Sequence, residues 1–387
     1  MAGRPGTADD LEARELSAID QVTASEWNAL DGTQCPFLRH EFLAALEHSG
    51  CVGGRTGWTP AHLALFDGGR LVGAAPVYRK AHSWGEFVFD FGWAQAYERH
   101  GLAYYPKLLL AVPFSPINAA RLLLAPDLPA TALRAQLINA LKQRCEAQRL
   151  SSTHALFLAD GEHGAFLEAG WLMRSDVQFH WHNRGFASFE DYLATFRADK
   201  RKQMRRERRR VAEQGIQIRT WHGSDIPAAE LRFAFAMHER NFHLHGHEPY
   251  LNFACFQELT RTLGDAFMVK LASQGEEPVA AAVFMVSQDA LYGRYWGSTG
   301  DFHSLHFETC YHQGIDYCIE RGIARFEPGT QGEHKIVRGF EPTATHSAHY
   351  IVDPRFRDAL ADFLSREQAA MDEYAAAASV HVPFHRA

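Results

Sequence analysis

The chain has 387 residues, of which 46% are hydrophobic, and a formal net charge of −7. This length suits two domains of about 150 residues or more, and the acidic balance argues against a protein with a generally basic, nucleic-acid-coating surface. Six cysteines without a Cys-x-x-Cys pair exclude a disulfide framework and a zinc ribbon. The N-terminus lacks an apolar signal-peptide core and no apolar run reaches about 18 residues, so we expect a cytoplasmic protein without stable membrane insertion.

The predicted elements of the first half alternate between helices and strands. Residues 1–20 are expected to form a flexible leader. The segment Asp67-Gly68-Gly69-Arg70 joins two β-rich runs and predicts a hairpin, because such a turn needs positive φ. The predicted elements are a helix at 36–48, strands at 61–66, 71–78 and 86–91, a helix at 130–150, a strand at 154–158, a helix at 162–169 and a strand at 171–181.

A second cycle of elements begins near Phe186, and Ser188 is a candidate N-cap for its first helix. The run SQGEEPVAAAVFM repeats the order of FDGGRLVGAAPVY in the first half, with a glycine turn followed by an alanine-rich strand. We therefore expect two similar α/β lobes, residues 21–185 and 186–387. The predicted elements are one long helix at 188–214, a strand at 216–220, helices at 228–242 and 252–263, and strands at 266–272 and 278–286.

The most informative stretch runs from Gly293 to Pro342 and has the order strand, loop, helix, strand, charged loop. The helix is predicted over 306–321, because its apolar residues have helical spacing and Gly322 is a stop signal. The flanking strands are expected at 291–296 and 323–326. In open α/β sheets, ligands bind where strands end. The loop after the second strand is therefore the predicted functional centre.

Several of these motifs resemble the Fem-like N-acyltransferase family, which is associated with peptidoglycan biosynthesis or recognition. The resemblance covers about residues 30–370 and implies an α/β (α+β) fold of two tandem acetyltransferase-like (GNAT) lobes with mixed sheets flanked by helices. One departure concerns the junction GSTGDFHSLHFE, which lacks the Arg/Gln-x-x-Gly-x-Gly/Ala pattern of acetyltransferases that use CoA. The motifs are Phe114-Ser115-Pro116, the basic run 201–210, His247-Glu248-Pro249-Tyr250-Leu251, SLHFETCYHQGIDYCIERG and RFEPGTQGEHKIVRGFEP.

The resemblance implies acyl or aminoacyl transfer to an amine, with acyl-CoA or aminoacyl-tRNA as the donor. No permanently bound cofactor is expected, and acyl-CoA would act as a co-substrate. Amide formation needs a base for the amine's proton and a cation or N–H group for the oxyanion. Glu333, His334 and Glu308 are the candidate bases, and Lys335 and Arg338 are the candidate charge stabilisers. A salt-bridged loop that closes the sheet is the alternative for the segment that holds Glu333 to Arg338.

The basic run ADKRKQMRRERRR carries its charges all round the predicted helix, so they repel one another unless an anion binds. Phosphates of the donor or an anionic membrane surface are candidate ligands, and pairing with acidic neighbours is the alternative. Other candidate binding residues are Phe114, Ser115, Tyr250, Tyr295, Trp296 and His349, together with Lys200, Arg201, Arg205 and Arg208 of the basic run.

Neither a metal site nor a covalent nucleophile is expected. The alternating histidines of NFHLHGHE share one face if extended, but no companion ligand cluster with finger spacing exists. Ser115 lies outside any Gly-x-Ser-x-Gly elbow. His346 and His349 are expected to face opposite sides of a strand, so at most one points into the site. Two other functions stay open, a non-catalytic binding protein for a cell-wall precursor and an RNA-binding protein that uses the basic helix.

Overall fold

The computed structural model describes residues 11–329 and 332–385. The chain divides into two compact units: residues 1–176 with Thr345–Met371, and Val177–Ala344 with Asp372–Ala387. This division differs from the predicted boundary after residue 185, because residues 345–371 return to the first unit. The reason is strand pairing, since His349 lies opposite His154 in an antiparallel ladder.

The first unit holds two sheets, with strand orders β1-β3-β4-β7 and β15-β8-β6-β5-β2. The predicted flexible leader is wrong for residues 12–16, which form β1 and pair with β3, and its residues 1–10 lie outside the described chain. The strands are β1 (Glu12–Leu16), β2 (Trp58–Pro60), β3 (His62–Asp67), β4 (Arg70–Ala75), β5 (Val77–Lys80), β6 (Lys107–Leu110), β7 (Leu123–Leu124) and β8 (Ser152–Ala155). The helices are α1 (Ala24–Asn28), α2 (His40–His48), α3 (Phe91–Arg99), α4 (Ala130–Ala147) and α5 (His163–Glu168).

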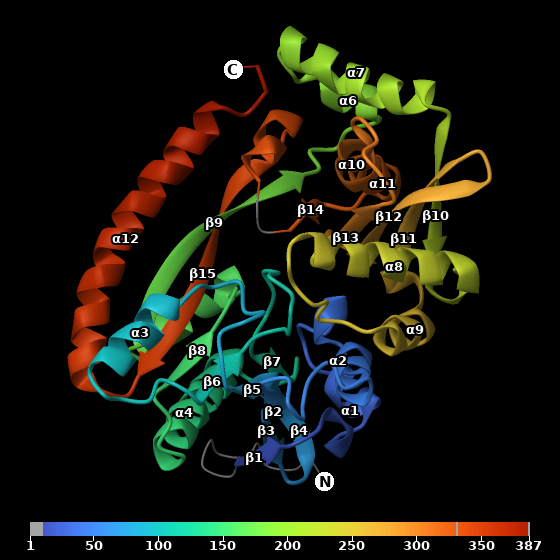
Figure 1. Cartoon of the computed structure of the whole chain (residues 1–387). Helices are drawn as coiled ribbons and strands as arrows, with labels where there is room; N and C mark the ends of the chain where they lie inside the picture. The colour runs from blue at the N-terminus through green and yellow to red at the C-terminus, as the bar shows by residue number, and fades with distance from the viewer. Residues whose placement is uncertain (1–10, 330–331, 386–387) are drawn as a thin grey trace. The chain divides into compact units, whose positions relative to one another are not determined.

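In the second unit the strand order is β10-β11-β12-β13-β14-β9. Helices α8 and α9 lie on one face of strands β10 to β13, and α10 and α11 lie on the other (Figure 1). The strands are β10 (Ile216–His222), β11 (Phe267–Gln274), β12 (Glu277–Val286), β13 (Ala290–Ser298) and β14 (Arg325–Glu327). The helices are α6 (Phe189–Ala194), α7 (Ala198–Glu213), α8 (Ala228–Leu244), α9 (Phe253–Thr262), α10 (Leu305–Phe307), a π-helical segment (Glu308–His312), α11 (Gln313–Arg321) and a 3₁₀ segment (Glu333–Arg338).

Three elements run from one unit into the other. They are β9 (Leu172–His182), β15 (Glu341–Ile351) and α12 (Pro354–Val380). Helix α12 has no counterpart among the predicted elements. It has 27 residues, yet in the described part of the chain no helix is both long and apolar enough to cross a membrane.

Two predicted elements are wrong for identifiable reasons. The strand expected at 86–91 is a bent segment followed by α3, because Phe87 has positive φ and the carboxylates of Glu86 and Asp90 turn inward to Lys107. The long helix expected at 188–214 breaks between α6 and α7, where Phe196 forms a β-bridge with Phe384. The N-cap prediction is confirmed, since the Ser188 side chain accepts a hydrogen bond from the Asp191 amide.

Close packing of β13 against α8 depends on Gly297. A Cβ atom at this position would lie 2.1 Å from the main-chain oxygen of Met237 in α8, and a backbone oxygen cannot rotate away. We expect Gly297→Ala to lower the free energy of unfolding by about 1–3 kcal/mol, as overpacking does. Urea unfolding measures this change. Gly300→Ala is the matched control, because its nearest contact would be an ordinary 3.6 Å, and equal losses in both variants would contradict the argument.

Candidate active site in the second unit

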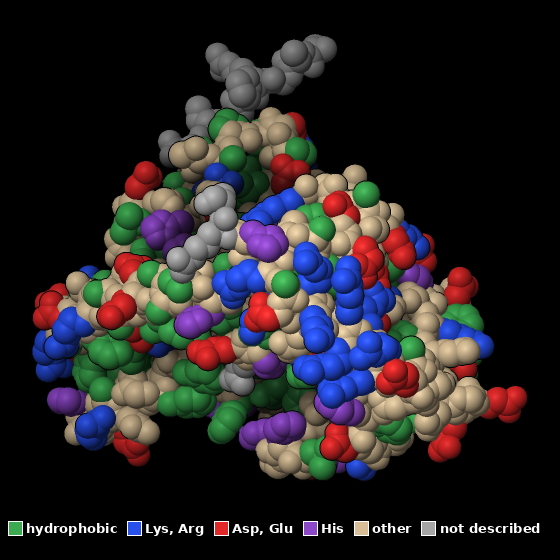
Figure 2. Space-filling view, turned by 90° about the horizontal axis from the view of Figure 1, so that it is seen from above, with side chains coloured by type: hydrophobic (Ala, Val, Ile, Leu, Met, Phe, Trp, Pro, Cys, Tyr) green, Lys and Arg blue, Asp and Glu red, His purple; other side chains and the backbone are tan. Residues whose placement is uncertain are grey.

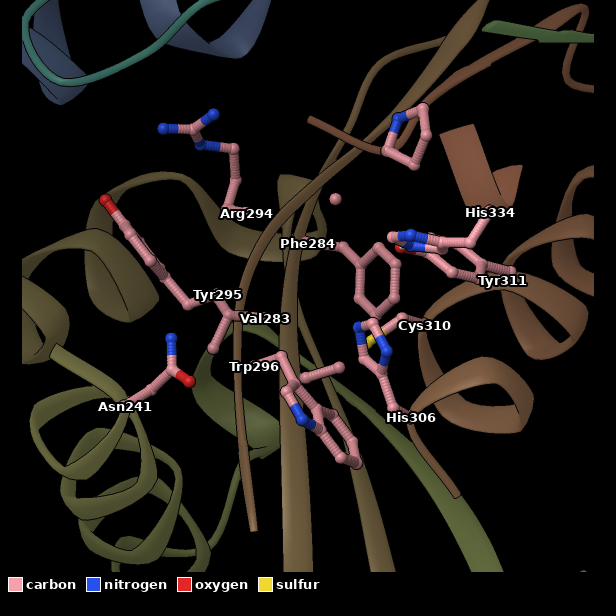
Figure 3. Close-up of a pocket in the computed structure, with 13 residues that line it drawn as sticks. Asn241, Val283, Phe284, Arg294, Tyr295, Trp296, His306, Cys310, Tyr311 and His334 are labelled. Atoms are coloured by element: carbon pink, nitrogen blue, oxygen red, sulfur yellow. The ribbon is translucent and has the colours of Figure 1, made fainter. Parts of the chain in front are cut away.

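A cavity of about 460 Å³ opens where β13 and β14 part. The two strands pair in parallel only from Ala290 opposite Arg325 to Tyr292 opposite Glu327. Strand β13 then continues to Ser298, whereas β14 ends, so the gap beyond Tyr292 is left for side chains and ligand. The lining residues are Asn241, Ala282, Val283, Phe284, Gly293, Arg294, Tyr295, Trp296, His306, Cys310, Tyr311, Pro328 and His334 (Figure 3).

The cavity is lined from both faces of the sheet. Successive strand residues point to opposite faces, and Tyr295 faces α8, where its ring lies 4.2 Å from that of His238. Trp296 faces the other way, with its ring 5.3 Å from that of His306. Figure 3 shows Asn241 and Tyr295 on one side of the strands and His306 and Tyr311 on the other. The gap is therefore lined by side chains from both faces of the sheet.

A β-bulge shapes the cavity wall. Val283 lies opposite Tyr295 and Phe284 lies opposite Gly293, so Arg294 is an extra residue in β13. Bulges bend a strand and re-aim a side chain, and they are common beside active sites. The guanidinium of Arg294 lies 5.5 Å from the Tyr295 ring, and Figure 3 shows it extending on the same side of the strands as Tyr295.

His334 and Tyr311 form the polar pair of the cavity. The His334 Nε2 atom and the Tyr311 hydroxyl share a hydrogen bond of 2.8 Å. Burial, and then the charges of Lys335 and Arg338, hold the pKa of His334 below its ordinary value. Burial likewise lowers the pKa of His306 to about 4 and raises that of the Tyr311 phenol. These three groups are neutral at pH 7. The His334 imidazole can accept a proton there, whereas a pKa of about 4 makes His306 a weak base.

The other candidate catalytic residues do not line this cavity. Lys335 is buried and donates to the main-chain oxygen of Gly329 at 2.7 Å, and burial lowers its pKa to about 7. Glu333 is exposed and accepts a hydrogen bond from the Tyr374 hydroxyl at 3.1 Å. Within the ionisable loop, the structure therefore brings His334 alone to the cavity among the residues that it describes.

Arg338 and Glu308 are both buried, and each belongs to its own set of ionic contacts. The guanidinium of Arg338 donates to both carboxylate oxygens of Glu207, at 2.7 and 3.1 Å, and to the main-chain oxygen of His334 at 2.6 Å. The Glu308 carboxylate accepts from Gln313 at 2.9 Å and lies 3.4 Å from Arg208. Both groups therefore stabilise the elements around the cavity and do not line it.

The basic run forms α7, and acidic neighbours pair with part of it. Arg205 lies 2.5 Å from Glu190, and Arg208 lies 2.6 Å from Asp316. Lys200 lies 3.8 Å from Asp199, and Arg201 donates to the main-chain oxygen of Phe196 at 3.5 Å. Lys202 and Arg206 are exposed. Figure 2 shows Lys and Arg side chains gathered on one face of the molecule, the side on which α7 lies in Figure 1.

The remaining predicted binding residues lie elsewhere. Phe114 is buried with its ring 5.1 Å from Trp58, and Ser115 beside it is also buried. His349 is buried in the first unit, where its Nδ1 lies 2.7 Å from that of His154. His346 instead lies against His163, so the prediction that the two histidines of β15 face different sides is confirmed. The ring of Tyr250 lies 5.4 Å from Phe242.

Ten of the thirteen lining residues are not among the predicted site residues, and five of these ten carry a polar group or a thiol: Asn241, Arg294, His306, Cys310 and Tyr311. In the sequence, Tyr311 is one of the apolar residues whose spacing predicts the helix at 306–321. His306 and Tyr311 are five residues apart, a spacing that an ordinary α-helix does not bring to one side, but the π-helical segment at 308–312 does. The histidines of NFHLHGHE are not on an extended segment either, because α8 continues to Leu244, and the described residues contain no cluster of three or more metal-ligating side chains.

Comparisons with known proteins identify the family. The model of the FemAB_like family, described as peptidoglycan biosynthesis/recognition, matches residues 18–386. No curated protein matches the chain. Among solved structures, FemX is 10% identical, with a TM-score of 0.52 over 90% of this chain and 100% of that one. The C-terminal domain of a protein described as a lysylphosphatidylglycerol synthetase from Agrobacterium fabrum is 8% identical, with a TM-score of 0.52 over 86% and 91%. L-PGS from Bacillus licheniformis is 9% identical, with a TM-score of 0.50 over 84% and 96%.

These identities are low, so the likeness to the solved structures concerns the fold alone, and it confirms the predicted fold class. The family match spans nearly the whole chain and confirms the resemblance that the motifs indicated. The chain therefore belongs to the FemAB_like family of peptidoglycan biosynthesis and recognition, and its mixed α/β fold is similar to that of FemX.

Proposed function

We propose that this protein, a transferase of the acyl or aminoacyl type, forms an amide at the cavity between β13 and β14. The donor is an acyl-CoA or an aminoacyl-tRNA, and the acceptor is an amine. The observation that carries the proposal is a gap in the sheet lined from both faces, which lets donor and acceptor meet without passing one another. Holding two reactants in line supplies much of the rate in such a reaction.

His334 is the proposed base. The acceptor amine attacks the carbonyl carbon of the donor, its proton passes to the neutral imidazole, and a C–N bond forms. The C–S bond of a thioester or the C–O bond of an ester then breaks, and the leaving sulfur or oxygen takes up a proton. The hydrogen bond to Tyr311 orients the His334 ring, and its lowered pKa keeps it unprotonated at neutral pH.

The test is product formation by His334→Asn, followed by mass spectrometry with a panel of acyl-CoAs, aminoacyl-tRNAs and amines. We expect the rate to fall by about 10²–10⁴-fold, the contribution typical of a positioned base. Thermal unfolding and the stabilisation by bound donor should stay near wild type, because the side chain is exposed and acts on the amine. His100→Asn, an exposed position on the first unit, is the matched control and should keep full activity. A fully active His334→Asn variant would contradict the assignment.

The exposed cations of α7 are proposed to hold phosphates of the donor. Lys202 and Arg206 lie on the same helix as the acid-paired arginines but are exposed. An alternative function, RNA binding without chemistry, rests on this same basic face (Figure 2). Affinity for uncharged bulk tRNA that falls steeply with salt, with no product from any donor, would favour that alternative. Product that forms from one donor class would exclude it.

A further inference from the structure

A second cavity, of about 370 Å³, lies in the second unit between two strands and a helix. It shares no lining residue with the cavity at β13 and β14. Strand β10 contributes Thr220 and His222, β11 contributes Lys270, and α11 forms the opposite wall. The lining residues are Thr220, His222, Lys270, Gln313, Asp316, Tyr317, Glu320 and Arg321.

Lys270 is the buried cation of this cavity. Its residue is 3% exposed, and its Nζ donates to the Thr220 hydroxyl at 2.9 Å. Burial lowers its pKa to about 8, so it still carries its charge at pH 7. An ammonium has three donors, and in the described chain no carboxylate lies within 4 Å of this one. Buried charges are normally paired. The ammonium of Lys270 therefore has donors available for an acceptor group on a ligand.

Two carboxylates lie across the cavity from Lys270. Asp316 and Glu320 are one turn apart on α11, and both act on the charge of Lys270 without touching it. Arg208 occupies one oxygen of Asp316 at 2.6 Å, whereas Glu320 is exposed at the rim. Between them, the Tyr317 ring is buried and lies 5.3 Å from the Lys270 Nζ. The cavity therefore has the ammonium of Lys270 on one wall, two carboxylates and the exposed Arg321 on the α11 wall, and an aromatic surface between them.

We propose that this cavity binds a small zwitterion of the α-amino-acid class. The carboxylate accepts hydrogen bonds from Lys270 and Thr220, and the ammonium lies toward Asp316 and Glu320. A simple anion would satisfy Lys270 but lie against two carboxylates, and a simple cation would satisfy the carboxylates but lie against Lys270. An α-amino acid carries an ammonium and a carboxylate on the same carbon atom, and its side chain can lie on Tyr317. The site is separate from the proposed active site and does not rest on it.

The experiment is isothermal titration of the full-length protein with the L-amino acids, followed by matched fragments of the tightest one. For L-alanine, for example, the fragments are propionate, which lacks the ammonium, and ethylamine, which lacks the carboxylate. We expect one or more amino acids to bind and both fragments to bind at least about tenfold more weakly, the factor that corresponds to one lost charged contact. Inorganic phosphate should not compete.

Variants place the binding in this cavity. Lys270→Met should abolish amino-acid binding, and Glu320→Gln should weaken it. If Lys270→Met does not fold, Thr220→Val replaces it as the test, because Thr220 is exposed, and this variant should weaken amino-acid binding. His334→Asn alters the other cavity and should leave the binding unchanged. The proposal is overturned if no L-amino acid binds, if propionate, ethylamine or phosphate binds as tightly as the amino acid, or if the binding survives all three changes in the second cavity.

Discussion

Lys107→Met is expected to lower the free energy of unfolding of the first unit by about 3–5 kcal/mol, the usual cost of removing one partner from a buried ion pair. Lys107 is fully buried, and its ammonium contacts both Glu86 and Asp90. It also donates to the Ser83 hydroxyl at 2.9 Å. Methionine has similar volume but no charge, so Asp90 would lose the cation that contacts it and Glu86 would keep only Lys80, at 3.9 Å. Urea unfolding followed by tryptophan fluorescence measures the loss.

The pH dependence of this loss has a definite sign. Burial would raise the pKa of Asp90, but the charge of Lys107 holds it at about 2, whereas burial raises the pKa of Glu86 to about 7. Without Lys107 the carboxyl of Asp90 should also titrate higher in the folded state. A carboxyl whose folded pKa is raised destabilises the folded state as pH rises through that pKa. The loss in free energy of unfolding caused by Lys107→Met should therefore be larger at pH 8 than at pH 5.

Two further variants test the cause of the loss. Lys142→Met removes a lysine whose ammonium makes one hydrogen bond, to the main-chain oxygen of Ala169 at 3.2 Å, and should cost about 1 kcal/mol. Adding Asp90→Asn to Lys107→Met removes one of the two buried carboxylates that contacted Lys107, so the double variant should recover part of the free energy of unfolding. A double variant that is less stable than the single one would mean that charge burial is not the cause.

Local signals in the sequence predicted the local structure well. The turn Asp67-Gly68-Gly69-Arg70 forms the predicted hairpin, and both glycines have positive φ. Gly322 ends the helix that includes α11 in the left-handed conformation. The strand, helix and strand that hold the cavity were predicted with boundaries close to those observed. These features depend on residues a few positions apart, so periodicity and turn chemistry can indicate them.

The sequence could not indicate the surroundings of the ionisable side chains, because these depend on ion pairs between residues far apart in the chain. Arg208 finds its carboxylate partner 108 residues along the chain, at Asp316, and Arg338 finds Glu207 131 residues back. From the sequence, the loop that holds Glu333 to Arg338 is predicted to be one catalytic cluster. In the structure, its side chains lie in different surroundings. In a 3₁₀ turn, residues three apart lie on one side, so Lys335 and Arg338 are buried together while His334 stays at the cavity.

Arg338→Met is expected to destabilise the second unit by about 3–5 kcal/mol. The residue is 3% exposed, and its guanidinium binds Glu207 with two hydrogen bonds and lies 3.4 Å from the Phe307 ring centre. The variant would leave the Glu207 carboxylate buried with only the hydrogen bonds from His312 and Gln203. Chemical denaturation measures the loss, and Arg205→Met is the matched control. Arg205 forms an exposed pair with Glu190, so its removal should cost at most about 1 kcal/mol.

The acid dependence of the same variant distinguishes the ion pair from a packing defect. Burial alone would raise the pKa of Glu207, but the hydrogen bond from His312 and the charge of Arg338 bring it down to about 2. A lowered carboxyl pKa adds stability above the unfolded value of 4.5, and this contribution disappears as pH falls toward 2. The difference between wild type and Arg338→Met should therefore be full at pH 7 and shrink steadily below pH 4.5. A difference that does not change with pH would show that Arg338 acts through packing alone. Loss of activity with unchanged stability would instead restore Arg338 as the oxyanion partner.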